Sequence, residues 1–147
     1  TIPMVTLYSP RPVDVLEHGE ILTEIRIPHP KGKTGTAFHK MAKTANDFAT
    51  ITIAVRLTFT GSTISEARIA LNAITKKPFR CKDAENYLTG KGASAEVFNE
   101  ASIKSLSGLD VTQDFRASRE YRMEILPVLV RRCLEAATKA ANPGGSK

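Results

Sequence analysis

One run of strict alternation constrains the fold of this chain more than any other feature. Between Ile51 and Phe59 every second residue is apolar, and the residues between them are Thr, Ala or Arg. A period of two is that of a β-strand with one buried face. Residues 60–63 (TGST) supply turn chemistry, and the segment from Ile64 to Ala73 then alternates again. The sequence therefore predicts two strands joined as an antiparallel hairpin.

Two more strands are predicted upstream of this hairpin. The segment Ile21 to Ile27 alternates with period two and is stopped by Pro28, and a second strand is predicted over residues 36–42. Residues 1–19 carry three prolines and one glycine. This composition is typical of an extended connecting segment. We expect that segment to be the tail of a preceding domain.

After residue 78 the apolar period changes to that of helices. Three helices are predicted: residues 83–88, residues 94–106 with Ser94 as N-cap, and a longer helix from about Ser118 to Ala140. On the longest helix, apolar residues recur at three- and four-residue steps. This spacing places Tyr121 in the core and Arg122 on the surface, and Pro127 is a point where the helix could kink.

The order of these elements predicts the fold class. Strands come first and helices last, which indicates an α+β fold. We expect an antiparallel sheet of three to four strands packed against about three helices, as a two-layer sandwich whose helices bury the stripe from Ile51 to Phe59. The last residues, 142–147, contain a proline and two glycines and are expected to be disordered.

Composition and motifs exclude several classes of protein. The 147 residues suit a single domain, no apolar run is long enough to span a membrane, and the net charge of +6 is modest for a nucleic-acid binder. Phosphate-loop, zinc-protease and nucleophile-elbow motifs are absent from the sequence. His18, His29 and His39 are isolated from one another, so no metal site is predicted. Cys81 and Cys133 have neither CxxC nor disulfide-framework spacing, which favours a reducing compartment, expected to be the cytoplasm.

Six short motifs follow one another in an order that resembles a known family. They are residues 19–28 (GEILTEIRIP), 38–40 (FHK), 46–49 (NDFA), 67–71 (ARIAL), 78–80 (PFR) and 118–122 (SREYR). In this order they resemble the carboxy-terminal domain of the FAD-binding medium subunit of molybdenum hydroxylases, the group of carbon monoxide and xanthine dehydrogenases. The resemblance covers nearly the whole chain. It implies that residues 20–141 form this flavoprotein domain and that residues 1–19 are the tail of a preceding FAD-binding domain.

The resemblance also implies a function, that of an oxidoreductase component lining the isoalloxazine of FAD. In the family, electrons from a molybdenum centre pass through iron–sulfur clusters to the flavin and on to an acceptor. The implied partners are the N-terminal FAD-binding domain and the subunits that carry the molybdenum cofactor and the iron–sulfur clusters. The family's flavin-contacting positions map onto Leu22 and Lys40, and the loop after the lysine adds Asp47 and Phe48. Because the family's pyrophosphate-binding segments lie upstream, the isolated chain is expected to retain no FAD and to be inactive.

Each of these residues also has a structural explanation. Lys40 suits a solvated strand lysine, Asp47 a turn cap and Phe48 a core residue. Leu22 lies on the face of the predicted strand opposite to the isoleucines, where it is free to contact something other than the core. A cation at Lys40 would stabilise the negative charge of a reduced flavin.

A second function, from a different class, is a small basic α+β module that binds RNA or an acidic protein partner. Its basic residues would be Lys31, Lys33, Lys40, Lys43, Lys76, Lys77, Arg80 and Lys82. A sheet that reads RNA needs exposed aromatic residues between basic ones. The predicted strands offer only Phe38 and Phe59. Aromatic content therefore favours the flavoprotein hypothesis, and no nucleic-acid partner is expected.

Overall fold

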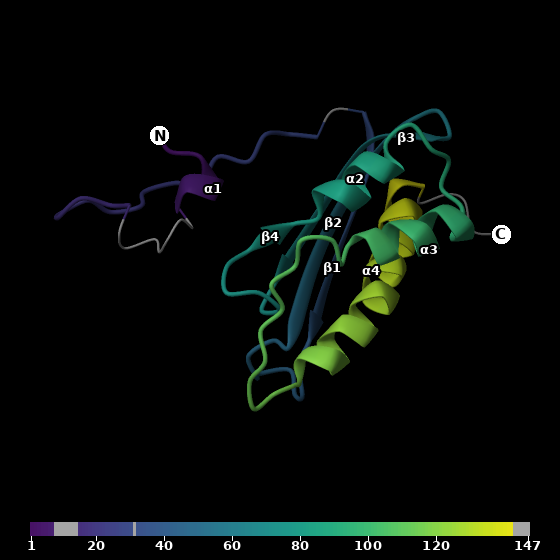
Figure 1. Ribbon diagram of the computed structural model, residues 1–147. Helices are drawn as coiled ribbons and strands as arrows, with labels where there is room; N and C mark the ends of the chain where they lie inside the picture. Colours follow the sequence, from purple (N-terminus) through teal and green to yellow (C-terminus); the bar gives the residue numbers. More distant parts are fainter. Residues whose placement is uncertain (8–14, 31, 143–147) are drawn as a thin grey trace.

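A four-stranded antiparallel sheet forms the centre of the chain (Figure 1). The computed structural model describes residues 1–7, 15–30 and 32–142. The strands are β1 (Lys33–Met41), β2 (Ile51–Thr60), β3 (Thr63–Asn72) and β4 (Phe79–Arg80), hydrogen-bonded in the order β1-β2-β3-β4. Every pair is antiparallel. The predicted β2–β3 hairpin and the strand before it are confirmed, and the two-residue β4 is an addition that the sequence did not reveal.

Three helices cover one face of the sheet, which confirms the α+β sandwich. They are α2 (Lys82–Leu88), α3 (Ala95–Lys104) and α4 (Arg119–Ala141). Serine caps start the two longer helices, and the cap at Ser94 confirms a prediction from the sequence. The Ser94 hydroxyl accepts a hydrogen bond from the Val97 amide, and the Ser118 hydroxyl accepts one from the Tyr121 amide. Helix α4 continues through Pro127 without a break.

The core lies between the sheet and these helices. In β2 the apolar residues of the alternating stripe are buried, with Ile51, Ile53 and Leu57 fully inaccessible to solvent. From the helix side, Leu126 and Leu134 of α4 are also fully buried. Burial of such side chains contributes about 1.5–3 kcal/mol each. The alternation in the sequence therefore sets which face of the sheet receives the helices.

Helix α4 approaches β1 most closely at Gly35. A Cβ atom on Gly35 would lie 1.9 Å from the carbonyl oxygen of Ala137 and 2.5 Å from the amide nitrogen of Ala141. No side chain fits in that space, so glycine is required at this position. The contact fixes the C-terminal end of α4 against the first half of β1.

The start of α4 corrects one prediction. Arg122, expected on the surface, is completely buried, whereas Tyr121, expected in the core, is 49% exposed. Arg122 lies four residues before Leu126 and so continues the buried stripe of the helix. The neighbouring Tyr121 is turned by one position away from that stripe.

The N-terminal region lies apart from the sheet (Figure 1). Residues 4–7, expected to be extended, form the short helix α1 (Met4–Leu7). The strand predicted over residues 21–27 is not formed: this segment has no regular secondary structure and all of its residues are exposed. Among the described residues, no strand lies beside its backbone to pair with it. At the other end, Asn142 caps α4 through its amide and the carbonyl oxygen of Thr138, whereas the rest of the predicted disordered tail lies outside the described residues.

Candidate functional site

The face of the sheet opposite the helices carries Phe38 and Lys40 of β1. In the register of the sheet, Phe38 lies opposite Ala54 of β2, and Lys40 lies opposite Thr52. Phe38 is 69% exposed although it is aromatic. In the described chain, the helices that contact the sheet, α2 and α4, pack on its other face, and the face that carries Phe38 is called the outer face below. An aromatic ring and a flexible cation are thus presented side by side above small residues.

The Lys40 ammonium is held by the loop that joins β1 to β2. Its Nζ donates a hydrogen bond to the carbonyl oxygen of Ala45 at 3.0 Å. In the part of the chain that the structure describes, Lys40 forms no ion pair. A positive charge without a carboxylate partner remains available to a negative group above the outer face.

The same loop contains two more of the predicted site residues, Asp47 and Phe48. The Asp47 carboxylate accepts a hydrogen bond from the Thr44 amide at 3.1 Å, and the Asp47 amide donates one to the Thr44 carbonyl oxygen. Asp47 therefore has the turn-capping role that its residue type allows. Phe48 does not enter the core, because 83% of its surface is exposed. Lys40, Asp47 and Phe48 thus belong to one end of β1 and its following loop.

Leu22 is separate from the other three predicted site residues. It lies in the N-terminal segment and lines a hollow with residues of α1 and the following chain, such as Leu7, Leu16 and Ile25. Phe48 and Asp47 line a different hollow, together with Phe115 and Arg116 from the loop before α4. The structure therefore brings three of the four residues together and leaves the fourth apart.

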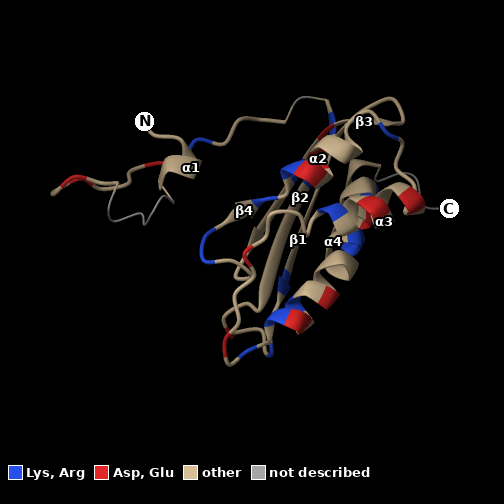
Figure 2. Cartoon of the chain, in the orientation of Figure 1, with Lys and Arg blue, Asp and Glu red and all other residues tan. Residues whose placement is uncertain are grey.

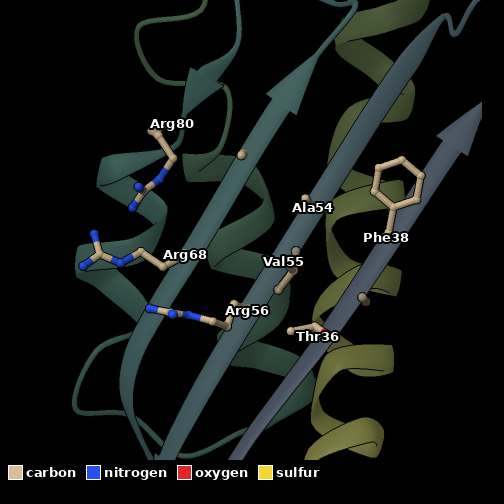
Figure 3. A pocket seen from close by; sticks show the side chains of 9 residues that line it. Thr36, Phe38, Ala54, Val55, Arg56, Arg68 and Arg80 are labelled. Carbon is tan, nitrogen blue, oxygen red and sulfur yellow. The ribbon is translucent and has the colours of Figure 1, made fainter. Parts of the chain in front are cut away.

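Three arginines mark the outer face beside Phe38. Arg56 of β2, Arg68 of β3 and Arg80 of β4 line, with Phe38, a shallow hollow of about 670 Å³ whose floor includes Ala54 (Figure 3). In Figure 3 the three guanidinium groups lie on one side of the hollow and the Phe38 ring on the other. Reasoning from the sequence alone missed Arg56 and Arg68, because their proximity depends on the register between strands.

Carboxylates on the outer face offset most of this charge. Glu66 accepts hydrogen bonds from both Arg56, at 2.7 Å, and Arg68, at 2.6 Å. The hydrogen bond from Arg68, together with the charge of Arg56, holds the pKa of Glu66 below its ordinary value. One carboxylate shared by two arginines leaves an excess positive charge at this position.

Arg80 has a structural role at the sheet's other edge. Its guanidinium forms a two-pronged ion pair with the buried Glu85 of α2, with N–O distances of 2.6 and 2.7 Å. A Glu85 oxygen also accepts a hydrogen bond from the Ile69 amide at 2.7 Å. The hydrogen bonds to Glu85 raise the pKa of Arg80. Arg80 and Glu85 together attach α2 to β3 and β4.

The described residues give no indication of a metal site or of a membrane span. No group of three or more His, Cys, Asp or Glu side chains is close enough to hold a metal ion within residues 1–7, 15–30 and 32–142. Over the same residues, no helix combines the length and hydropathy needed to cross a bilayer.

Comparison with known proteins supports the resemblance found in the sequence. The family model described as the CO dehydrogenase flavoprotein C-terminal domain matches residues 36–137. The carbon monoxide dehydrogenase medium chain of Hydrogenophaga pseudoflava is 28% identical over 93% of this chain and 48% of its own length. The nicotine 6-hydroxylase medium subunit of Paenarthrobacter nicotinovorans is 35% identical over 80% of this chain and 41% of its own length.

A solved structure shows the same fold. A chain of the carbon monoxide dehydrogenase from Hydrogenophaga pseudoflava superimposes with a TM-score of 0.80 and 31% identity, over 86% of this chain and 44% of that chain. The present chain spans less than half the length of these relatives. The family match covers most of the sheet, helices α2 and α3, and all but the last four residues of α4. The chain belongs to the CO dehydrogenase flavoprotein C-terminal domain family.

Proposed function

We propose that this chain is the C-terminal part of a flavoprotein subunit of a molybdenum hydroxylase and lines the isoalloxazine of FAD with its outer sheet face. Family membership supports the flavoprotein assignment. The flavin is placed on the outer face because the exposed Phe38 and Lys40 lie two residues apart on that face of β1. Residues 20–141 are then the C-terminal domain, preceded by an FAD-binding domain whose tail is residues 1–19.

The residues present suit the ring of FAD. Phe38 offers an exposed aromatic face, and Ala54 beside it leaves room for a flat group. The Lys40 ammonium, oriented by the Ala45 carbonyl oxygen, supplies a positive charge next to that position. FAD, when bound, accepts electrons and passes them to an acceptor. Lys40 stabilises negative charge that accumulates on the ring, and Phe38 excludes water from one side of it.

The loop after β1 has a supporting role in this proposal. Asp47 holds the loop in a turn through Thr44, and this turn presents the Ala45 carbonyl oxygen to Lys40. The exposed Phe48 extends the apolar surface at the same end of the strand.

The names of the relatives suggest the partner subunits of this domain. They are named as medium chains or FAD-binding subunits of dehydrogenases and hydroxylases. On this basis the chain would receive electrons that originate at a molybdenum cofactor and pass through iron–sulfur clusters on partner subunits. Both cysteines are free thiols, which agrees with a reducing compartment and supports a cytoplasmic location.

The test is the reduction potential of FAD in the assembled subunit carrying Lys40→Met. Loss of the positive charge should lower the potential by on the order of tens of millivolts, because the reduced ring is the more negative form. Lys33→Met is the matched control: Lys33 lies at the far end of the same strand and, opposite Phe59, on its helix-facing side. Equal shifts in both variants, or no shift in either, would show that Lys40 is a surface lysine.

The alternative of a basic RNA-binding module has weaker support. Phe38 is the one aromatic residue on the described outer face, and the arginines beside it are engaged by Glu66 and Glu85. An RNA-reading sheet stacks two or three bases on exposed rings. The outer face therefore suits a single flat cofactor better than a run of bases.

A further inference from the structure

Strand β1 has one free edge. It is the first strand of the sheet and pairs with β2 alone. Along its other side, no strand of the described chain takes up its backbone groups. On its helix-facing side, Ala37 and Met41 are only partly buried, although they pack against the core. A strand edge of nine residues with unpaired backbone groups is a site where another strand can add.

The segment immediately before β1 has the properties of such a strand. Residues 21–27 contain Ile21, Leu22, Ile25 and Ile27, whose exposed fractions range from 54% to 83%. Their backbone forms no hydrogen bond with another segment in the described part of the chain. An exposed group of four large apolar side chains is unusual, and it indicates that another part of the complete protein covers this segment.

The connection between this segment and β1 has the length of a hairpin loop. Residues 28–32 separate Ile27 from Lys33, and hairpin loops commonly contain two to five residues. Gly32 has a φ of +77°, a left-handed conformation that allows the chain to reverse. We propose that residues 21–27 pair antiparallel with the free edge of β1 in the flavoprotein subunit, with Ile27 opposite Lys33, as a fifth strand of the sheet.

This register places the isoleucines on the helix-facing side of the sheet and Leu22 on the outer face. On the helix-facing side, Ile25 falls opposite Gly35 and Ile21 opposite His39, so the two isoleucines flank the partly buried Ala37. On the outer face, Leu22 falls opposite the exposed Phe38. A slip of one residue would turn the isoleucines to the outer face and Glu24 toward the helices.

Charge complementarity supports the same register. Among residues 15–27 there are three glutamates, at positions 17, 20 and 24, and one arginine, Arg26 (Figure 2). Glu20 falls opposite Lys40. Glu24 falls opposite Thr36, whose other neighbour across the sheet is Arg56. Arg26, which donates a hydrogen bond to Glu24, falls on the same face, so the segment brings a net charge of −1 to an outer face that keeps an excess positive charge beside Glu66.

The pairing also explains how two separated residues could serve one cofactor. Leu22 would come to lie next to Phe38 and diagonally from Lys40, on the same face. This consequence rests on the proposed flavin contact. The pairing itself rests on the free edge, the exposed segment and the loop length, and would stand if the flavin were elsewhere.

A disulfide test can measure the register in the complete flavoprotein subunit with its FAD. Glu24→Cys with Thr36→Cys places two cysteines directly opposite each other, where antiparallel Cα atoms are about 4.5–5.5 Å apart and a disulfide can close. The matched control, Glu24→Cys with Thr34→Cys, is out of register by two residues on the same face, roughly 8 Å apart. Burial raises the pKa of the native thiols of Cys81 and Cys133 to about 12 and about 11, so they should not interfere.

With an added thiol oxidant, the first pair should form an intramolecular disulfide, identified by mass spectrometry, at least tenfold faster than the control pair. Equal rates, or no disulfide in either, would overturn the proposal. A disulfide between two subunits would overturn it too, by assigning the edge to a second copy of the chain. In the unmodified subunit, fast hydrogen exchange at the β1 amides that point away from β2 would also contradict it.

The flavin potential of Lys40→Met, measured in the same subunit, separates the two proposals. If the disulfide forms while Lys40→Met leaves the flavin potential unchanged, the strand pairing stands and the flavin contact fails. If the potential shifts as expected but no disulfide forms, the flavin contact stands and the strand pairing fails.

Discussion

Arg122 donates a hydrogen bond from Nη1 to the carbonyl oxygen of Ala73, 2.7 Å away, and thereby ties the start of α4 to the end of β3. Ala73 has a φ of +65°, a left-handed conformation that is unfavourable for a residue with a side chain. The same guanidinium bonds to Asp114 Oδ1 at 2.7 Å and to the Thr112 hydroxyl. One buried cation thus holds a strained turn and the loop before α4 in place.

Arg122→Met is expected to destabilise the chain by about 1–3 kcal/mol, the typical cost of leaving a buried hydrogen-bond acceptor without its partner. The Ala73 carbonyl oxygen would lose its hydrogen bond, and Asp114 would lose its buried partner. The measurement is the free energy of unfolding from urea titration. Arg132→Met, at an exposed position on the same helix, is the matched control and should change the free energy by less than about 0.5 kcal/mol. Equal losses in the two variants would contradict the role given to Arg122.

Asp114 should make the stability of the chain sensitive to acid. Hydrogen bonds from Arg116 and Arg122 hold the pKa of Asp114 far below its ordinary value. A carboxyl group whose pKa is lowered by folding stabilises the fold above its unfolded pKa, near 4, and this contribution is lost as the pH falls further. The advantage of the wild-type chain over Asp114→Asn should therefore be constant above about pH 5 and shrink steadily below pH 4.

The measurement for Asp114 is the urea midpoint of both chains between pH 7 and pH 2.5. Asp110→Asn, at an exposed position outside the Arg122 network, is the control. A difference between wild type and Asp114→Asn that is the same at every pH would show that the carboxylate charge does not contribute.

Gly35→Ala is expected to separate α4 from β1. The added Cβ would overlap backbone atoms of Ala137 and Ala141, which cannot move independently of the helix. Overpacking of this kind typically costs about 1–3 kcal/mol. Thermal unfolding should show a Tm several degrees lower. Gly92→Ala, where a Cβ would have no atom within 4 Å, is the control and should leave the Tm nearly unchanged.

The isolated 147-residue chain, mixed with FAD and desalted, should carry no flavin absorbance. Its outer face offers contacts for one side of the ring only, from Phe38 and Lys40. Such partial contact leaves most of the cofactor in solvent, and small-molecule sites normally enclose most of their ligand. Stoichiometric yellow protein after desalting would mean that the chain contains a phosphate-binding element that has not been recognised.

The regular elements of the fold could be predicted because their periodicity is local. The alternation from Ile51 to Phe59 and the capping residue Ser94 can each be recognised within a few residues of sequence. The two-residue β4 has no such pattern, since it exists only by pairing with β3. The segment before β1 shows the converse: its alternation is strong, but a strand needs a partner as well as a pattern.

The candidate site rests on the sequence only in part. Lys40, Asp47 and Phe48 were assigned through the resemblance of two neighbouring motifs, residues 38–40 and 46–49, and their role stays a prediction. Arg56 and Arg68 become neighbours only through the pairing of β2 with β3, which a single sequence does not specify. For Arg122 a signal was present, because it is in phase with Leu126 and Leu129 on the buried stripe of α4. We nevertheless predicted Arg122 on the surface, because a charged side chain is seldom buried.

The strand order β1-β2-β3-β4 also bears on how the chain reaches its structure. Each strand is hydrogen-bonded to the next one along the sequence, so the sheet can grow by short steps from the tight β2–β3 turn. Helix α4 differs, because the strands that it contacts, β1 and β2, are far from it along the sequence. Its docking closes the largest loop and is expected to be the late, slow event of folding. Because no side chain fits at Gly35, helix α4 can dock closely only when this glycine lies opposite Ala137 and Ala141, so the contact selects the correct alignment of helix and strand.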